Sequence, residues 1–313
     1  MKKVGCIGVI CTDVIVRHVN EMPEKGKLMP VNSITLQSGG CANNMAIDLK
    51  VMGVDVSLLG VIGNDGFGQY LKTNYEKYGV NTTGLKMVDG IDTSSSVVMS
   101  SSDGERSFWH CFGSNAALSD KDIDFDIVKN LDIISVMGTN LMPKFDGVPT
   151  ANVLKKCKEM GKITTLDNAW DATGRWLELV GPALPYIDYY MPSIEEASLI
   201  AGKTEVEDIC DVFLEKGVGT AIIKMGDKGS YIKNKNINKF IPSYKVKAVD
   251  TNGAGDSFCA GFVCGLANDW DLEKCAKFGN AVGALMVMSV GATGGAKPMS
   301  EVLKFLNERE SNK

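Results

Sequence analysis

The sequence predicts an α/β protein with a doubly wound, mostly parallel sheet flanked by helices, together with a second, small β-sheet. The first observation is that short apolar runs rich in β-branched residues alternate with segments whose apolar residues recur at helical spacing. The second is that two segments, at about residues 13–37 and 93–112, interrupt this alternation with patterns typical of extra strands. Strands that alternate with helices form parallel sheets, and ligands of such sheets bind at the carboxyl ends of the strands.

The core elements follow from the apolar runs in chain order. Strands are expected at residues 4–10, 56–62, 133–137, 163–166, 189–191 and 221–225, and helices at residues 42–52, 67–78, 148–160 and 195–201. Residues 301–313 are expected to form an amphipathic helix. The chain of 313 residues exceeds the usual length of one domain, but α/β folds often reach such lengths with insertions. We therefore expect a single domain over residues 1–313 into which the extra strands are inserted.

The two inserted segments are expected to pair into a small sheet that covers one end of the main sheet as a lid. Polar and apolar residues alternate in them, for example at residues 93–99 and 106–110. A small sheet with exposed edges and apolar side chains needs a partner for one face, and isologous pairing is the commonest solution. The sequence thus predicts a homodimer formed through the lid. The expected contacts are Val14, Val16, Ile34, Leu36, Val97, Val98 and Phe108.

Composition restricts the partners of the protein. Apolar residues make up 44% of the chain and charged residues 23%, which is typical of globular proteins with a substantial core. The net charge is −5 and the basic residues are scattered, so we expect no binding to nucleic acid or to an anionic membrane. No apolar run is long enough to span a membrane. The nine cysteines include no C-x-x-C pair and fit a reducing compartment, so a cytoplasmic protein is expected.

The run DTNGAGDSF at residues 250–258 is the segment that most clearly carries chemistry. A turn of Gly253, Ala254 and Gly255 leads into a helix that is expected to begin near Asp256. Small residues before a helix expose backbone N–H groups, and the helix dipole adds roughly half a positive charge at that end. The turn therefore predicts an anion-binding site.

The acidic residue in this run decides between two interpretations. In one, the glycines serve only the tight turn and Asp256 caps the helix, which is what a bare Gly-x-Gly would favour. In the other, Asp256 takes part in a reaction. A carboxylate at an anion site would repel a phosphate if the site only bound it, but it is well placed to accept the proton of an attacking hydroxyl. Asp256 is therefore the candidate general base.

This run resembles the C-terminal signature of the ribokinase-like (PfkB) carbohydrate kinases. A second run, GGCANNMA at residues 39–46, is similar to the N-terminal signature of that family, a Gly-Gly turn that leads into a helix whose asparagine contacts the substrate. Two such motifs in the family's order, joined by an α/β pattern with inserted strands, are more specific than either alone. The resemblance covers nearly the whole chain. It implies an ATP-dependent kinase that phosphorylates a hydroxyl or hydroxymethyl group of a small sugar.

The resemblance also implies roles for individual residues. Asp256 matches the family's catalytic base, and the turn before it matches the anion hole. Asp13 and Asn44 match residues that hold sugar hydroxyls, while Gly39 and Gly40 let the sugar approach the backbone. A carboxylate and an amide suit a diol, which offers donors and acceptors together. Judged from the residues alone, Asp13 could instead cap a turn and Asn44 could be a residue at a helix start.

The nucleotide side is marked less sharply. The run KMGDKG at residues 224–229 resembles the family's strand and turn near the ATP phosphates, which implies contacts from Lys224, Gly226 and Gly229. An ordinary hairpin is the alternative. Asn280 resembles a position on the helix that flanks the adenine. No G-x-x-x-x-G-K-[ST] run occurs, which excludes a P-loop mechanism.

Metal use is implied by two further positions. Many members of the family carry Asn-x-x-Glu where it orders Mg²⁺ and its water shell. Here Glu196 keeps the acidic position, but Ser193 replaces the asparagine, so altered rather than absent Mg²⁺ use is expected. Asp250 matches a position near which many relatives bind a monovalent cation, with the end of a strand as the alternative. The implied cofactors are ATP and Mg²⁺, with K⁺ as a further candidate.

Three other functions stay open at this point. A nucleoside or sugar-phosphate kinase of the same family is one, because Lys27 and Arg106 lie in the inserted segments and could meet a phosphate. A dinucleotide oxidoreductase is suggested by GVIGNDGFG at residues 60–68, but the spacing differs from G-x-G-x-x-G. A non-catalytic sugar or nucleotide sensor is the third, since fold does not determine function. The sugar itself is expected to be selected by the inserted strands and by Trp109, His110, Asn168, Trp170 and Trp176.

Overall fold

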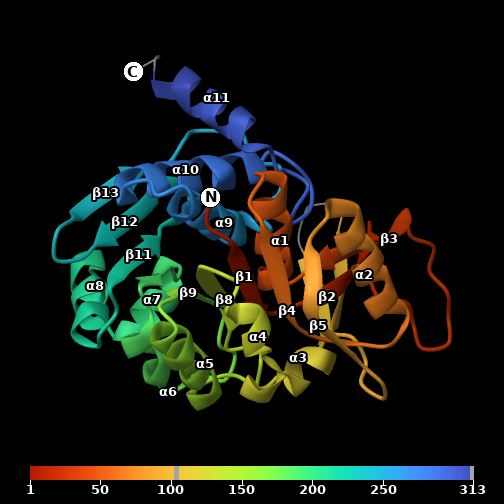
Figure 1. The fold of residues 1–313 in the computed structure, drawn as a ribbon. Coiled ribbons are helices and arrows are strands. Elements are labelled where there is room, and N and C mark those ends of the chain that lie inside the picture. The colour runs from red at the N-terminus through yellow and green to blue at the C-terminus, as the bar shows by residue number, and fades with distance from the viewer. Residues whose placement is uncertain (102–105, 311–313) are drawn as a thin grey trace.

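The computed structural model describes residues 1–101 and 106–310, with a nine-stranded sheet at its centre (Figure 1). The strands of this sheet are β1 Val4–Gly8, β4 Val56–Gly63, β5 Asn81–Val88, β8 Ile133–Thr139, β9 Ile163–Asn168, β10 Tyr189–Tyr190, β11 Thr220–Lys224, β12 Gly229–Lys233 and β13 Asn238–Pro242. Their spatial order is β13-β12-β11-β10-β9-β8-β1-β4-β5. The strands from β11 to β5 run parallel, whereas β12 and β13 pair antiparallel at one edge.

Helices cover both faces of this sheet (Figure 1). One face packs against α1 Cys41–Val51, α2 Gly66–Tyr78, α9 Ala254–Ala267, α10 Leu272–Met286 and α11 Met299–Glu310. The other packs against a second set, α4 Phe125–Val128, α5 Val148–Glu159, α6 Leu177–Val180, α7 Ile194–Ala201 and α8 Val206–Glu215, with the short α3 Gly113–Ala117 beside β4. No helix among these residues is long and apolar enough to cross a membrane.

The sequence of β1 explains why helices are needed on both sides. Cys6 is buried in one hydrophobic cluster, and its neighbour Ile7 is buried in the other. Because successive side chains of a strand point to opposite faces, a continuous apolar run requires cover on each face. The predicted doubly wound α/β fold is confirmed.

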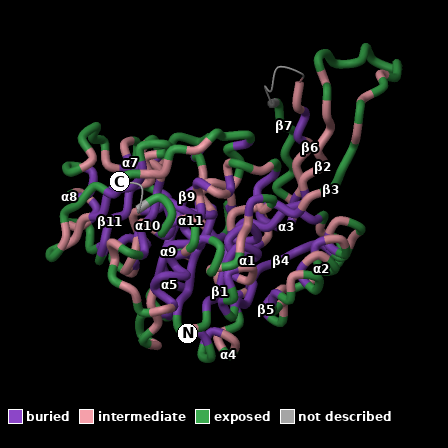
Figure 2. The backbone as a smooth tube through the Cα atoms, turned by 90° about the horizontal axis from the view of Figure 1, so that it is seen from above, coloured by how far each residue is buried: buried purple, intermediate pink, exposed green. Residues whose placement is uncertain are grey.

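Four further strands form a separate small sheet. They are β2 Cys11–Arg17, β3 Ser33–Gly39, β6 Ser95–Ser100 and β7 Arg106–Cys111, in the order β3-β2-β6-β7. β2 and β6 pair parallel, which joins the two inserted segments, and the other pairs are antiparallel. Figure 2 shows this sheet projecting from the body of the molecule. The predicted second sheet is confirmed, and we call it the lid sheet.

The register divides the expected dimer contacts between the two faces of the lid sheet. Val14 lies opposite Leu36 and Val97, and this row faces away from the Asp13 side. Val98 and Phe108 lie opposite each other on the same face as Asp13. The expected contacts therefore do not form one continuous surface within a subunit.

Most differences from the predicted elements concern edges and ends. The expected strand at residues 4–10 ends at Gly8, and the chain then enters the lid sheet at Cys11. The C-terminal helix begins at Met299, and residues 311–313 lie outside the described residues. The sequence analysis did not identify β5, β12, β13 or α8. Two of these, β5 and β13, are the edge strands of the sheet, where exposed residues weaken the apolar pattern.

Candidate active site

A cleft of about 750 Å³ opens at the carboxyl ends of the parallel strands. Its lining includes the ends of β9 and β11, the start of α7 and the start of α9. Ligands of open α/β sheets bind at this edge, because the strand ends and the helix starts meet there. The lining residues are Cys41, 167–169, 193–196, 224–228 and 251–256.

Helix α9 starts at the predicted anion site, but two residues earlier than expected. Its first residue is Ala254 and its N-cap is Gly253, so Asp256 lies inside the first turn and is not the cap. Gly253 has a φ of 76°, and a Cβ atom there would overlap the backbone of Ala292. The first N–H groups of a helix have no acceptor within the helix. Because residues 253–256 line the cleft, the positive end of the helix dipole lies at this cleft.

Asp256 is held from the neighbouring helix α1. The Asn44 side chain donates a hydrogen bond to Asp256 Oδ2 at 2.7 Å, and Asn43 donates to Asn44 Oδ1 at 3.0 Å. Burial raises the pKa of Asp256, while the hydrogen bond from Asn44 and the charge of Lys224 oppose this. A buried carboxylate with a raised pKa is a stronger proton acceptor than an exposed one.

A buried ion pair contributes to the lining of the cleft. Lys224 Nζ is 2.5 Å from Asp167 Oδ2, and the two side chains are 12% and 3% exposed. Burial alone would lower the pKa of Lys224, but the Asp167 carboxylate, Cys259 and Glu196 together raise that pKa, so the ammonium stays charged. Burial raises the pKa of Asp167 to about 7, although the charge of Lys224 opposes this shift. The pair places a positive charge next to Gly255 in the predicted anion hole.

The predicted sugar residues meet at the start of α1. Gly40 is the N-cap of this helix with a φ of 93°, and a Cβ atom there would overlap the backbone of Val9. A Cβ atom at Gly39 would overlap the Asp13 carboxylate, so the glycine allows that close approach. Burial raises the pKa of Asp13. Asp13, Gly39, Gly40 and Asn44 thus lie close together beside Cys41, which lines the cleft.

The predicted nucleotide residues line an adjoining cavity of about 550 Å³ with mostly apolar walls. Lys224, Gly226, Gly229 and Asn280 all contribute to it. The turn at Gly226 joins β11 to β12 as an antiparallel hairpin, so the hairpin interpretation is confirmed, and contacts from this run to a nucleotide stay a prediction. The Asn280 amide donates to two carbonyl groups at the end of β13, at 3.1 and 3.3 Å, and thereby fixes one wall.

Comparisons with known proteins identify the family of the chain. The sequence profile of the "pfkB family carbohydrate kinase" matches residues 1–298. The chain belongs to this family of carbohydrate kinases. It is 29% identical over 311 residues to the ATP-dependent ribose-1-phosphate kinase of Halopiger xanaduensis, covering 99% of each chain. It is 26% identical to the ribokinase of Haemophilus influenzae, covering 92% of this chain and 94% of that one.

Solved structures show the same fold. The ribokinase of Thermotoga maritima superimposes with a TM-score of 0.86 at 28% identity, covering 98% of this chain and 100% of that one. The Arabidopsis thaliana ribokinase in complex with ribose and ATP gives a TM-score of 0.83 at 25% identity, covering 97% and 98% of the two chains. The present chain is thus a kinase with a ribokinase-type fold over nearly its whole length.

The residues that were expected to bind metal ions form hydrogen bonds within the protein. Ser193 and Glu196 form a capping box at the start of α7: Ser193 Oγ accepts from the Glu196 N–H at 3.3 Å, and Glu196 Oε2 accepts from the Ser193 N–H at 2.9 Å. Asp250 accepts from the N–H groups of Asn252 and Gly291, each at 2.9 Å. Within the described residues, no three His, Cys, Asp or Glu side chains cluster closely enough to hold a metal.

One buried acid beside the base was missed by the sequence analysis. Asp48 on α1 accepts a hydrogen bond from Ser257 Oγ at 2.6 Å, and its Oδ1 has no hydrogen-bond partner among the described residues. Burial raises its pKa to about 8, and the charge of Asp256 adds to the shift. A signal was present: Asp48 stands one helical turn after Asn44, in an otherwise apolar stretch.

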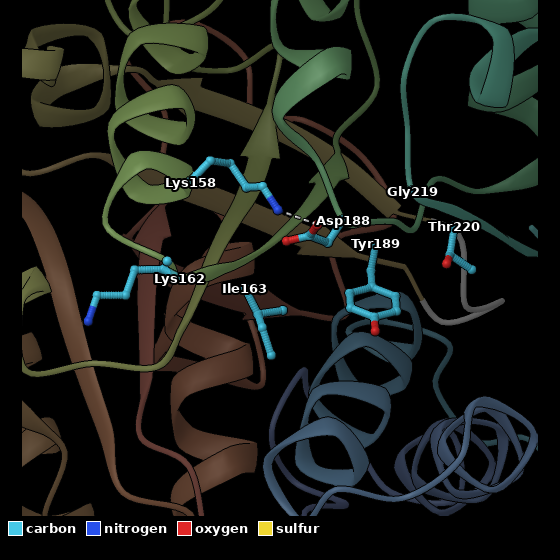
Figure 3. Close-up of a pocket in the computed structure, with 8 residues that line it drawn as sticks. Lys158, Lys162, Ile163, Asp188, Tyr189, Gly219 and Thr220 are labelled. Atoms are coloured by element: carbon cyan, nitrogen blue, oxygen red, sulfur yellow. Dashed lines mark hydrogen bonds and ion pairs between the residues drawn. The ribbon is translucent and has the colours of Figure 1, made fainter.

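Figure 3 shows the residues that line a further hollow. It has a volume of about 360 Å³ and lies where β9, β10 and β11 begin, with Lys158 Nζ donating to Asp188 at 2.5 Å across it. Because the amino ends of parallel strands face away from the catalytic edge, this hollow is not part of the active site. Its lining residues are Lys158, Gly161, Lys162, Ile163, Asp188, Tyr189, Gly219 and Thr220.

Proposed function

We propose that this kinase transfers the γ-phosphoryl group of ATP to a hydroxyl or hydroxymethyl group of a small sugar, with Asp256 as the general base. The observation that carries the proposal is the position of Asp256. Its carboxylate lies in the first turn of α9, held by Asn44 at 2.7 Å, directly after the N–H groups of residues 253–255. A proton acceptor and an anion hole at one point of a cleft are what phosphoryl transfer to an alcohol requires.

The proposed step is an in-line displacement. Asp256 accepts the proton of the sugar hydroxyl as its oxygen forms a bond to the γ-phosphorus, and the bond between that phosphorus and the β,γ-bridging oxygen breaks. ADP leaves with the electron pair of that bond. The N–H groups of Gly253, Ala254 and Gly255 stabilise the negative charge that develops on the oxygens, and the nearby Lys224 ammonium adds a fixed positive charge.

The remaining predicted residues hold the ligands. Asp13 and Asn44 are proposed to bind sugar hydroxyls, and the apolar cavity beside Asn280 to receive the adenine. Mg²⁺ is usually held by one or two carboxylates plus substrate phosphates, and it neutralises their charge when bound. Glu196 is the carboxylate that would reach its water shell, because it lines the cleft. Asp250 is the proposed neighbour of a monovalent cation.

A second candidate is a kinase whose substrate already carries a phosphate. It is favoured by the relative named ribose-1-phosphate kinase, at 29% identity over 99% of the chain. Lys27, which could meet that phosphate, lies in an exposed loop and pairs with Glu24 at 2.6 Å. The side chain of Arg106 lies outside the described residues.

An ADP-release assay over free sugars, sugar phosphates and nucleosides tests the proposal. We expect turnover with at least one small sugar, dependence on Mg²⁺, and a higher rate in K⁺ than in tetramethylammonium. A protein that binds a sugar in calorimetry but releases no ADP with any compound is a sensor, and that outcome would contradict the proposal.

A further inference from the structure

Two side chains of α1 hold consecutive residues of α9. The two helices pack against each other (Figure 1). Asn44 donates a hydrogen bond to Asp256 Oδ2 at 2.7 Å, and Asp48 Oδ2 accepts one from Ser257 Oγ at 2.6 Å. Asn44 and Asp48 are one helical turn apart, so they lie on the same face of α1. The two hydrogen bonds therefore connect α1 to the start of α9 at two neighbouring points.

Ser257 belongs to the turn that carries the proposed catalytic groups. Its backbone N–H donates to the carbonyl group of Gly253 at 2.8 Å and closes the first turn of α9. Its side chain is buried, and its hydroxyl group donates to Asp48. A buried hydroxyl group that lacks a partner costs free energy, so Asp48 favours one orientation of Ser257. Through Ser257, Asp48 restrains the turn in which Asp256 lies.

Asp48 occupies a position where an acid is costly. Its side chain is buried, and so are the apolar residues 45–47 and 49 around it on α1. Acidic side chains are rarely buried unless they are paired. Among the described residues, Asp48 pairs with no cation: Oδ2 contacts Ser257, and Oδ1 has no hydrogen-bond partner. An apolar side chain would be buried here at a lower cost, so stability does not explain the acid.

Asp256 is the charged group that faces Asp48. Burial raises the pKa of Asp48 to about 8, and the charge of Asp256 adds to this shift, whereas the hydrogen bond from Ser257 opposes it. The elements that pack against α1 are α2, α9, β1, β3, β4 and β8. The four strands carry no charged residue, and the charged residues of α2 are the exposed Lys72, Glu76 and Lys77. The other titratable groups of these elements and of α1 are Cys6, Cys41, Lys50, Tyr70, Tyr75, Tyr78, Cys259 and Cys264.

We propose that Asp48 is a positioning residue for phosphoryl transfer, because its hydrogen bond to Ser257 fixes the first turn of α9 and thereby the orientation of the Asp256 carboxylate. This inference rests on the kinase function proposed above. Asp48 does not line the cleft and acts through Ser257. A displaced base and displaced N–H groups slow the chemical step more than they weaken ligand binding, since both act on the transition state.

The test removes each side of this hydrogen bond. Asp48→Ala removes the acceptor, and Ser257→Ala removes the donor. The matched control is Ser135→Ala, which removes a buried hydrogen bond of 2.7 Å from Thr165 between β8 and β9, and neither of these residues lines the cleft. kcat and KM are measured by ADP release with the best substrate from a panel of sugars, sugar phosphates and nucleosides, and thermal melting shows whether each variant folds.

We expect kcat to fall about tenfold in Asp48→Ala and in Ser257→Ala, with the KM values for ATP and for the second substrate within about threefold of wild type. Ser135→Ala should keep the wild-type kcat. If Asp48→Ala does not fold, Ser257→Ala decides the question, because it removes the same hydrogen bond from the other side.

Asp48→Asn separates positioning from packing. Asparagine keeps an acceptor for Ser257 Oγ and resembles the neutral acid, so kcat at pH 7 should stay within about threefold of wild type. As the pH rises through about 8, wild-type Asp48 ionises and adds a second negative charge beside Asp256. Relative to Asp48→Asn, wild type should therefore lose up to about tenfold in kcat/KM for ATP between pH 7 and pH 9. A residue that only fills space would give no such difference.

The other outcomes separate this inference from the proposed function. If no compound supports ADP release, the kinase function is wrong, and this inference fails with it. If wild type turns over a substrate but folded Ser257→Ala keeps the wild-type kcat, the kinase function holds and this inference alone is wrong. The same conclusion follows if Ser135→Ala loses as much kcat as Ser257→Ala, if Asp48→Asn loses as much as Asp48→Ala, or if the pH profiles of wild type and Asp48→Asn coincide.

Discussion

Replacing Asp48 with asparagine should remove a pH-dependent loss of stability. Burial raises the pKa of Asp48 from 3.8 to about 8, so the folded state keeps a proton that the unfolded state releases above about pH 4. The contribution of Asp48 to the free energy of unfolding therefore has its full value below about pH 4 and decreases as the pH rises toward 8. One pKa unit corresponds to about 1.4 kcal/mol, so the loss between pH 5 and pH 8 reaches about 4 kcal/mol.

Asparagine keeps the shape of the side chain and can still accept the hydrogen bond from Ser257, but it does not titrate. Urea unfolding at pH 5 and pH 8 measures the effect. Wild type should lose up to about 4 kcal/mol more of its unfolding free energy than Asp48→Asn over this range. Asp55→Asn is the matched control. The Asp55 side chain is exposed, and its Oδ2 is as far as 3.9 Å from Lys3 Nζ, so this variant should lose as much stability as wild type.

An equal loss in wild type and in Asp48→Asn would refute this reasoning, because Asp48 would then be ionised in the folded state across the range. The expected result has a functional meaning as well. A neutral acid can lie beside Asp256 without charge repulsion, whereas a second carboxylate there would raise the pKa of the base further.

Three further predictions address catalysis, binding and assembly. Asp256→Asn can still accept the hydrogen bond from Asn44, so sugar and ATP binding in calorimetry should persist while kcat falls by about 10²–10⁴; wild-type turnover in this variant would overturn the mechanism. Asp13→Ala should weaken sugar binding by about 5–150-fold and leave nucleotide binding unchanged, because bound hydroxyls lose their partner; unchanged sugar affinity would make Asp13 a structural residue. We also propose a dimer through the lid sheet, which sedimentation at micromolar concentration should detect and Leu36→Glu should weaken, since Leu36 is 43% exposed on the face away from Asp13; a monomeric wild type would contradict it.

The sequence was most informative where structure depends on neighbouring residues. The alternation of apolar runs predicted the parallel sheet and its helices, because burial on both faces leaves a continuous apolar strand. The run at residues 250–258 predicted an anion site, because a glycine turn before a helix exposes N–H groups whatever the rest of the fold. Even there, the first residue of the helix was misplaced by two positions, since the helix begins at Ala254 and not at Asp256.

Tertiary structure alone decided which distant side chains meet. Ser257 and Asp48 are 209 positions apart and touch only because α9 packs on α1, while Lys224 and Asp167 are 57 apart and meet across the ends of two strands. No local pattern encodes these distances. The lid sheet shows the same limit: a slip of one residue between β2 and β6 would turn Ser96 away from Asp13 and put the apolar row in its place. The sequence by itself determined the fold class and the chemical groups, and packing and register decided their partners.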